Sequence, residues 1–202
     1  MTPPSHPILK SIAKGEIRDV CLDLGCGTSK KEGFIGVDLI AHEGVDIVAD
    51  VFEVLASLPD HVVRAVHSSQ FFEHIYDIQR LLSEIDRVMQ SGGTLIVRVP
   101  HFSNPYYYSD PTHVRHFGLY TFSYLSRSSL FKRKVPRYAE NQNLLLESVS
   151  LIFDSPVRKS FRSLYKHILS LIFSSYFMME LYEECFCYLF PCSDIVYSLK
   201  KY

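Results

Sequence analysis

The sequence predicts a three-layer α/β fold, with five parallel strands, an antiparallel addition at one end of the sheet and a helical insertion near the C-terminus. Two observations support this prediction. Short, almost wholly apolar runs recur through the front half of the chain, and apolar residues at helical spacing lie between some of them. Such runs are typical of parallel strands that are covered on both faces. Their alternation with helices argues against a bundle or a sandwich.

The individual elements follow from the spacing of apolar residues. A helix is expected over 78–89, with Asp77 as its N-cap and Gly92-Gly93 as its end. A shorter helix is expected over 53–58, and 157–190 is expected to be mostly helical. The expected parallel strands are 19–24, 34–39, 45–49, 64–68 and 94–99, and the strands of the antiparallel addition are 144–153 and 195–200.

Composition excludes several classes of partner. The 202 residues are 47% hydrophobic and 21% charged, as in an average soluble domain. Their net charge is -1, which offers no basic face for phosphates, so nucleic acid is not an expected partner. The first residues contain no apolar signal core, and a cytoplasmic location is expected. The C-x-C-x4-C spacing at 185–192 lacks a second ligand pair and predicts no zinc site.

An uncharged apolar stretch lies near the C-terminus, at 168–179. It is shorter than the roughly twenty residues that a membrane span needs, and Glu180, Glu183 and Glu184 follow it closely. No stable membrane span is therefore expected. The stretch is interpreted as a buried or interface helix, so a homo-oligomer that forms through 157–190 is a candidate assembly.

A glycine-rich turn follows the first expected strand, where residues 23–27 read Asp-Leu-Gly-Cys-Gly. This place is at the carboxyl edge of the sheet, where open α/β sheets bind ligands. Gly25 and Gly27 allow the backbone to come close to a ligand, and the Asp23 carboxylate can meet an ammonium group. Asp38 ends the next strand, where its two oxygens can accept both hydroxyls of a ribose. The pattern predicts a nucleotide-type cofactor.

In this order the residues resemble the class I S-adenosylmethionine-dependent methyltransferases, in particular the small-molecule, methyltransferase type 11-like group. The resemblance covers about 18–100 and implies a Rossmann-like methyltransferase sheet, S-adenosyl-L-methionine as the cofactor and methyl transfer as the activity. Asp50-Val51 looks like the family's adenine-binding pair, and 68–74 looks like its small polar segment followed by Glu-His. The implied cofactor-binding residues are Asp23, Leu24, Gly25, Cys26, Gly27, Asp38, Leu39, Asp50, Val51, Ser68, Ser69 and His74.

One departure from the family pattern concerns the link between Gly27 and Asp38, which has little room for the usual crossover helix. A rival interpretation is a nicotinamide or flavin Rossmann domain. That fingerprint needs a small residue where Lys30 stands and an acid about 20 residues further on. Both requirements count against the rival.

A dense polar and aromatic segment, 101–117, follows the fifth expected strand. Methyl transfer to a hydroxyl usually needs a general base, and histidine suits that role near neutral pH. We therefore expect His101 and His113 to be catalytic, one of them as the base. Tyr106, Asp110, Arg115 and His116 are the expected substrate-binding residues, with Arg115 on an anionic group. A metal interpretation of Asp110, His113 and His116 is weaker, and no metal is predicted.

The acceptor is expected to be a small molecule. Residues 110–117 and 190–199 resemble bacterial methyltransferases, some encoded with surface-polysaccharide genes, which implies a hydroxyl of a sugar or related metabolite. Two alternatives stay open: a non-catalytic S-adenosylmethionine-binding or partner protein, and an aminopropyl transferase with an acidic polyamine pocket. A single domain over 1–202 is expected, with a cofactor-binding core at 18–100, a substrate-side segment at 101–140 and a helical cover or interface at 155–190.

Overall fold

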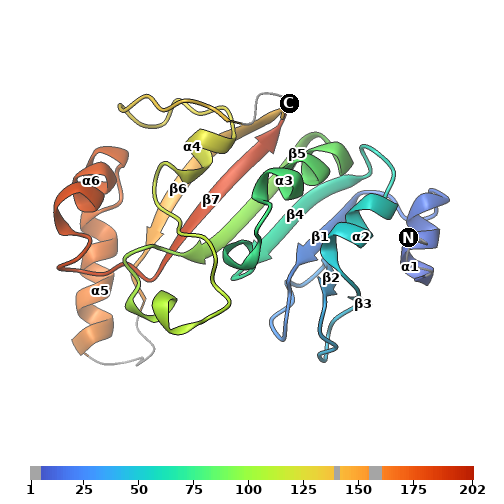
Figure 1. Cartoon of the computed structure of the whole chain (residues 1–202), viewed down its shortest axis with the longest axis horizontal. Helices are drawn as coiled ribbons and strands as arrows, with labels where there is room; N and C mark the ends of the chain where they lie inside the picture. The colour runs from blue at the N-terminus through green and yellow to red at the C-terminus, as the bar shows by residue number, and fades with distance from the viewer. Residues whose placement is uncertain (1–5, 139–141, 155–160) are drawn as a thin grey trace.

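The computed structural model describes residues 6–138, 142–154 and 161–202, and its seven strands form one sheet in the order β3-β2-β1-β4-β5-β7-β6 (Figure 1). Strands β1 to β5 pair in parallel, and β7 lies antiparallel between β5 and β6. The predicted five parallel strands with an antiparallel end addition are confirmed. The strands are β1 (Val20–Leu24), β2 (Ile35–Asp38), β3 (Ile47–Val48), β4 (Val63–Ser69), β5 (Met89–Pro100), β6 (Leu144–Ile152) and β7 (Asp194–Lys201).

The longest helices are α3 and α5, and three short segments of 3-10 or π-helix are named η1 to η3. The predicted helical insertion is present between β6 and β7 from residue 161 onward, while its expected beginning, 155–160, lies outside the described residues. The helices and turns are α1 (Pro7–Ala13), α2 (Val51–Ser57), η1 (Phe72–His74), α3 (Ile78–Val88), η2 (Pro105–Ser109), α4 (Thr121–Leu125), α5 (Phe161–Ile172), α6 (Tyr176–Leu181) and η3 (Tyr182–Phe186).

Helix α3 shows how far the local pattern decides the structure. Its apolar positions are buried, and the Asp77 side chain accepts a hydrogen bond from the Arg80 backbone at 3.0 Å, as expected of an N-cap. The helix nevertheless ends at Val88, before the expected Gly92-Gly93 stop. Strand β5 begins at once with Met89, which pairs with Val63 of β4. Sheet pairing therefore ends this helix earlier than the glycines would.

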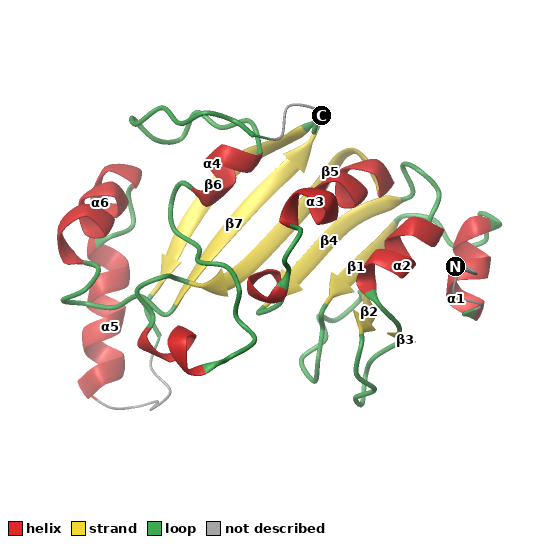
Figure 2. Ribbon diagram, viewed as in Figure 1, coloured by secondary structure: helices red, strands yellow, loops and turns green. Residues whose placement is uncertain are grey.

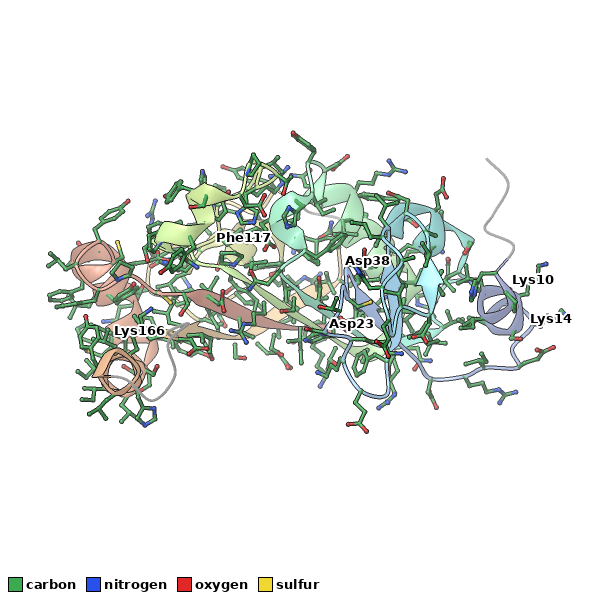
Figure 3. All side chains as sticks on the ribbon, turned by 90° about the horizontal axis from the view of Figure 1, so that it is seen from below. Lys10, Lys14, Asp23, Asp38, Phe117 and Lys166 are labelled. Atoms are coloured by element: carbon green, nitrogen blue, oxygen red, sulfur yellow. The ribbon has the colours of Figure 1, made fainter. Side chains whose placement is uncertain are left out.

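Helices α2, α3 and α4 lie on one face of the sheet, α1 lies at one end, and α5 and α6 lie at the other (Figures 1 and 3). Among the described residues no helix crosses the opposite face of β4, β5 and β7, where Thr94 and Lys200 are exposed. The expected third layer is thus missing there. The physical reason is that the β1–β2 and β2–β3 links are too short for crossover helices and run as loops (Figure 2).

Carboxylates hold the short β1–β2 link in place. The fully buried Asp23 accepts a hydrogen bond from the Lys31 backbone at 2.7 Å, while its other oxygen contacts Nδ1 of His67, also at 2.7 Å. Asp46, from the next loop, accepts from the Gly36 backbone at 2.7 Å and from Lys30 Nζ at 2.9 Å. The bond to Asp23 satisfies the Lys31 N–H group, which a helix would have satisfied internally, and the bonds to Asp46 tie the loop and the start of β2 to the next loop.

An aromatic cluster fixes the segment after β5 against the sheet. The Phe122 and Tyr197 rings lie 4.5 Å apart between centroids, and the Tyr197 hydroxyl donates to the Gly118 carbonyl at 2.7 Å. Phe117, fully buried, stacks near Phe122 on the side that carries α3 and α4 (Figure 3). The segment predicted to lie on the substrate side is therefore anchored by core residues.

The insertion presents an apolar stripe outward. Leu164, Ile168, Leu171 and Ile172 of α5 are exposed, while Leu169 of the same helix is buried. In the part of the chain that the structure describes, none of the helices combines the length and the apolar character needed to span a bilayer. Each of the five cysteines is described, and each is a free thiol.

Candidate cofactor and acceptor site

A cavity of about 440 Å³ opens at the carboxyl ends of β1 and β2, a size suited to a small-molecule ligand. Several predicted cofactor residues lie together in its wall: Gly25, Gly27, Asp38, Leu39, Asp50, Val51 and His74. Sequence reasoning missed the rest of the lining, which consists of Ile40, His42, Phe52, Gln70, Phe71 and Ile75.

The other predicted cofactor residues do not line this cavity, although they lie in the strands and the turn next to it. Leu24 and Ser68 are fully buried, and the Ser68 hydroxyl donates to the Leu24 carbonyl at 2.9 Å, which ties β4 to β1. Cys26 is buried, and burial together with the nearby Asp23 raises the pKa of its thiol to about 11. Ser69 ends β4 without reaching the cavity.

Two carboxylates face the cavity, and each already has a structural role. Asp38 Oδ2 accepts from the Gly27 backbone at 2.8 Å, and its Oδ1 accepts from the Ile40 backbone at 2.9 Å. Asp50 is the N-cap of α2, and one of its oxygens accepts from the Phe52 backbone at 2.8 Å. Because a carboxylate oxygen can accept more than one hydrogen bond, both side chains keep capacity for a ligand. Figure 3 shows Asp23 and Asp38 close together at this end of the sheet.

Close packing explains why Gly25 is a glycine. Its φ is +67°, and a Cβ atom at this position would lie 2.4 Å from the ring of Phe71. Phe71 follows Gln70, a non-glycine residue with φ of +57° whose side-chain amide donates to Asp194 Oδ1 at 3.1 Å. Gln70 lies in the 68–74 segment, which the sequence relates to the cofactor motif. Its polar amide could therefore have been predicted to line the cavity.

A second, larger cavity of about 760 Å³ lies across the segment from His74 to Asp77. Its wall combines tyrosine rings with carboxylates and an amide. It includes the predicted Arg115 and His116, and it is otherwise lined by Asp77, Ile78, Gln79, Val114, Phe117, Gly118, Tyr120, Thr121, Tyr124, Leu125, Tyr138 and Glu183. Of these, Glu183 accepts from the Leu119 backbone at 2.5 Å.

The two histidines expected to be catalytic occupy different environments. His101 is fully buried and lines neither cavity, with Nδ1 accepting from the Ser103 backbone at 3.1 Å and Nε2 3.2 Å from Glu183, which lines the second cavity. Because both ring nitrogens of His101 have hydrogen-bond partners, this side chain holds the segment after β5 in place. His113 instead lies beside His74, with 4.8 Å between ring centroids, at the edge of the cofactor cavity.

The expected substrate-binding residues are also separated. Arg115 Nε donates to the Ile75 carbonyl at 2.7 Å, and the same guanidinium donates to Tyr76, so much of its donor capacity is used within the wall between the cavities. Tyr106 is exposed and lines a different hollow. The Asp110 carboxylate is exposed and accepts from Thr112.

Glu73 was quoted in the sequence motif but not among the expected site residues, and its environment is unusual. One ligand atom each from Glu73, His74 and His113 lies within 4.8 Å of the others. The Glu73 side chain is fully buried, and neither carboxylate oxygen has a hydrogen-bond partner among the described residues. Burial raises the pKa of this carboxyl to about 8. The contact with His113 depends on the tertiary fold, which is why the sequence did not reveal it.

The raised pKa of Glu73 predicts a pH-dependent stability. Because the folded-state pKa lies above the ordinary value of 4.5, the folded state is favoured below pH 4.5, and this advantage is lost as the pH rises towards 8. Glu73→Gln should match the wild type at pH 5 and exceed its unfolding free energy by up to about 4 kcal/mol at pH 9. Denaturant titrations with a chelator present measure this difference. The exposed Glu147→Gln is the control, and parallel curves for Glu73→Gln and wild type would contradict the assignment.

Comparison with known proteins agrees with this geometry. Residues 22–97 match the family model of a methyltransferase domain. No curated protein sequence matches the chain significantly. The fold is similar to an S-adenosylmethionine-dependent methyltransferase from Archaeoglobus fulgidus, with 21% identity over 98% of this chain and 95% of that one and a TM-score of 0.59.

Two further solved structures share the fold. An S-adenosylmethionine-dependent methyltransferase from Mesorhizobium loti has 14% identity over 96% of each chain and a TM-score of 0.50. A Haloferax volcanii methyltransferase, solved in complex with the Trm112 methyltransferase activator, has 15% identity over 97% of this chain and 88% of that one, with a TM-score of 0.52. At these identities the likeness concerns the fold alone.

The family match covers the same part of the chain that supplies the glycine turn, Asp38 and Asp50 to the cofactor cavity. The order of the motifs, the residues that line the cavity and the fold all indicate the same type of domain. Residues 22–97 accordingly form a methyltransferase domain on the fold shared with S-adenosylmethionine-dependent methyltransferases, with S-adenosyl-L-methionine as the cofactor.

Proposed function

We propose that the chain transfers the methyl group of S-adenosylmethionine to a hydroxyl of a small, sugar-like metabolite. The observation that supports this acceptor is the second cavity, which joins three tyrosine rings to carboxylate and amide groups. The apolar C–H faces of a sugar pack on aromatic rings, while its hydroxyls donate to carboxylates and accept from amides. The net charge of -1 supports a small molecule over nucleic acid.

In this proposal the cofactor lies in the smaller cavity. Asp38 accepts the ribose hydroxyls with the lone pairs that Gly27 and Ile40 leave free, and Asp50 accepts the exocyclic amine of adenine. The turn at Gly25 and Gly27 lets the methionine part lie against the backbone. Asp23 acts indirectly, because its carboxylate fixes the loop at Lys31.

Methyl transfer needs the acceptor oxygen, the methyl carbon and the sulfur in line, so positioning supplies much of the rate increase. We assign His113, and not His101, to the reacting hydroxyl. His113 lies beside the cofactor cavity, whereas His101 is enclosed and already bonded to Ser103 and Glu183. His101 then positions the segment after β5.

The polyamine alternative receives less support. An aminopropyl transferase needs carboxylates that are free to bind ammonium groups. The second cavity has two acids, Asp77, which caps α3, and Glu183, which binds the Leu119 backbone and contacts His101. Their remaining lone pairs can accept from a hydroxyl, but their charge is already partly balanced and is a weak counter-charge for several ammonium groups. Groups arranged in this way favour a hydroxyl acceptor over a polycation.

Binding of the cofactor is tested by thermal shift, because a ligand that binds only the folded state raises its stability. S-adenosylmethionine and S-adenosylhomocysteine should stabilise the protein, and NAD should not. Asp38→Asn should weaken S-adenosylhomocysteine binding by about 30-fold, the loss expected for a charged hydrogen-bond acceptor. Glu16→Gln, an exposed carboxylate outside the cavity, is the control. Stabilisation by NAD alone would contradict the proposal.

Gly25 provides a second test of the cavity. In Gly25→Ala the new methyl group would displace Phe71 into the cavity, so S-adenosylhomocysteine affinity should fall by at least about 10-fold. Gly44→Ala is the matched control. Gly44 also has a positive φ, but a Cβ atom there would meet no other atom within 4 Å, and the residue does not line the cavity. Equal cofactor affinity in both variants would show that this turn does not contact the ligand.

The acceptor is tested by methyl incorporation from labelled S-adenosylmethionine into panels of free sugars, nucleotide sugars, polyamines and DNA. Label should enter a sugar hydroxyl and not the amines or DNA. His113→Ala should lower incorporation by at least about 100-fold, as expected when a group that promotes proton loss from the hydroxyl is removed. Incorporation into an amine would contradict the proposed acceptor, and stabilisation by the cofactor without any methyl transfer would favour a non-catalytic binding protein.

A further inference from the structure

The cluster of Glu73, His74 and His113 has the composition of a metal site. Its three residues come from two segments, η1 and the stretch after η2. The backbone joins these segments, since the Glu73 carbonyl accepts from Val114 at 2.9 Å and from Arg115 at 3.2 Å. These bonds hold the residue next to Val114, His113, over Glu73. The grouping of ligand atoms within 4.8 Å is therefore built into the fold.

The Glu73 carboxylate lacks a protein partner. It is fully buried, and neither oxygen accepts a hydrogen bond from the described residues. A buried polar group without a partner costs about 1–3 kcal/mol, and more if it is charged. Folded proteins tolerate such a group when a ligand or ion satisfies it. One oxygen of this carboxylate lies within 4.8 Å of a ring nitrogen of His74 and of His113.

Hydrogen bonds at Nδ1 leave Nε2 of both histidines as the nitrogen for an ion, and His113 Nε2 also lies 3.6 Å from Asp110 Oδ2. His113 Nδ1 lies 2.8 Å from the Tyr107 carbonyl, which can only accept, so this nitrogen carries the proton. His74 Nδ1 lies 2.9 Å from the Thr112 hydroxyl, which donates to Asp110 at 2.6 Å and therefore accepts from His74. Metal-binding histidines are typically oriented by such a bond from the other ring nitrogen.

We propose that Glu73, His74 and His113 bind a divalent transition-metal ion of the Zn²⁺ class. Two imidazoles and one carboxylate suit such ions, and three protein ligands leave one position open, as in catalytic zinc sites. Ligand atoms about 2.0–2.2 Å from one ion lie roughly 3.3 Å apart, so the present 4.8 Å spread has to close by about 1.5 Å. His74 and His113 are only partly buried, which leaves their side chains room to move.

The site adjoins the cofactor cavity, because His74 is part of the cavity wall. The open position accepts the acceptor hydroxyl, and this role rests on the proposed methyl transfer. A bound hydroxyl loses its proton to water more readily. Its oxygen lone pair then forms the bond to the methyl carbon, while the electrons of the carbon–sulfur bond go to sulfur. His113 would thus act on the hydroxyl through the ion and not as a free base.

Metal binding is measured on the full chain after chelator treatment and dialysis, by calorimetric titration with Zn²⁺. One tight equivalent should bind. Glu73→Gln and His113→Ala should each lower the affinity by at least about 100-fold, since loss of outer partners alone costs 10–100-fold. His116→Gln, a histidine of the same segment outside the cluster, should bind like the wild type. Thermal shift by S-adenosylhomocysteine shows whether each variant is folded, and the nearly isosteric Glu73→Gln decides if His113→Ala is not.

Co²⁺ in place of Zn²⁺ identifies the ligands by absorption. Nitrogen and oxygen ligands should give d–d bands without thiolate charge transfer. Charge-transfer bands would indicate a cysteine such as the exposed Cys185 and would overturn the proposal. Unchanged Zn²⁺ affinity in Glu73→Gln would overturn it too, as would absence of binding by wild-type protein that S-adenosylhomocysteine still stabilises. Absence of that stabilisation would instead contradict the proposed function.

Discussion

Three aspartates hold a short loop in the place where this type of fold usually has a crossover helix. Asp23 and Asp38 each accept a backbone hydrogen bond from the loop between β1 and β2, and Asp46 accepts from the Lys30 side chain of that loop and from the Gly36 backbone in β2. The glycine turn is held by these side-chain bonds together with backbone bonds from Gly25 and Cys26 to the Val37 carbonyl, because the loop forms no helix. The loops around the candidate cofactor cavity are therefore held by side-chain to backbone bonds as well as by backbone pairing, and α2 contributes Val51 and Phe52 to the wall.

The strands of the sheet could be predicted from the sequence because they contain short, largely apolar runs whose side chains are buried on at least one face. All of β1 is buried, and apolar runs of that kind have few alternative structures. Boundaries were less predictable. The end of α3 at Val88 depends on pairing of Met89 with Val63, a contact between residues far apart in sequence. The missing helices on the second face followed from link length, a feature that the sequence did show.

The candidate site was predictable in part. Asp38 and Asp50 line the cavity as the strand ends suggested, but each also holds backbone N–H groups, so strand-end carboxylates alone do not prove a ligand site. Asp23 does not line the cavity, and its carboxylate instead bonds to the Lys31 backbone and to His67. The unsatisfied Glu73 and its approach to His113 arise from two segments that meet in the folded chain, and no local pattern marks such a meeting.

The double use of Asp38 has a consequence for local motion. One carboxylate bonds to the glycine turn through Gly27 and to the loop after β2 through Ile40, so neither wall can open without breaking a bond of this side chain. The two walls accordingly form one cooperative unit of local unfolding. Under the proposed function, a nucleoside bound to Asp38 would raise the free energy of opening for both walls and would couple product release to the fluctuation of a single unit.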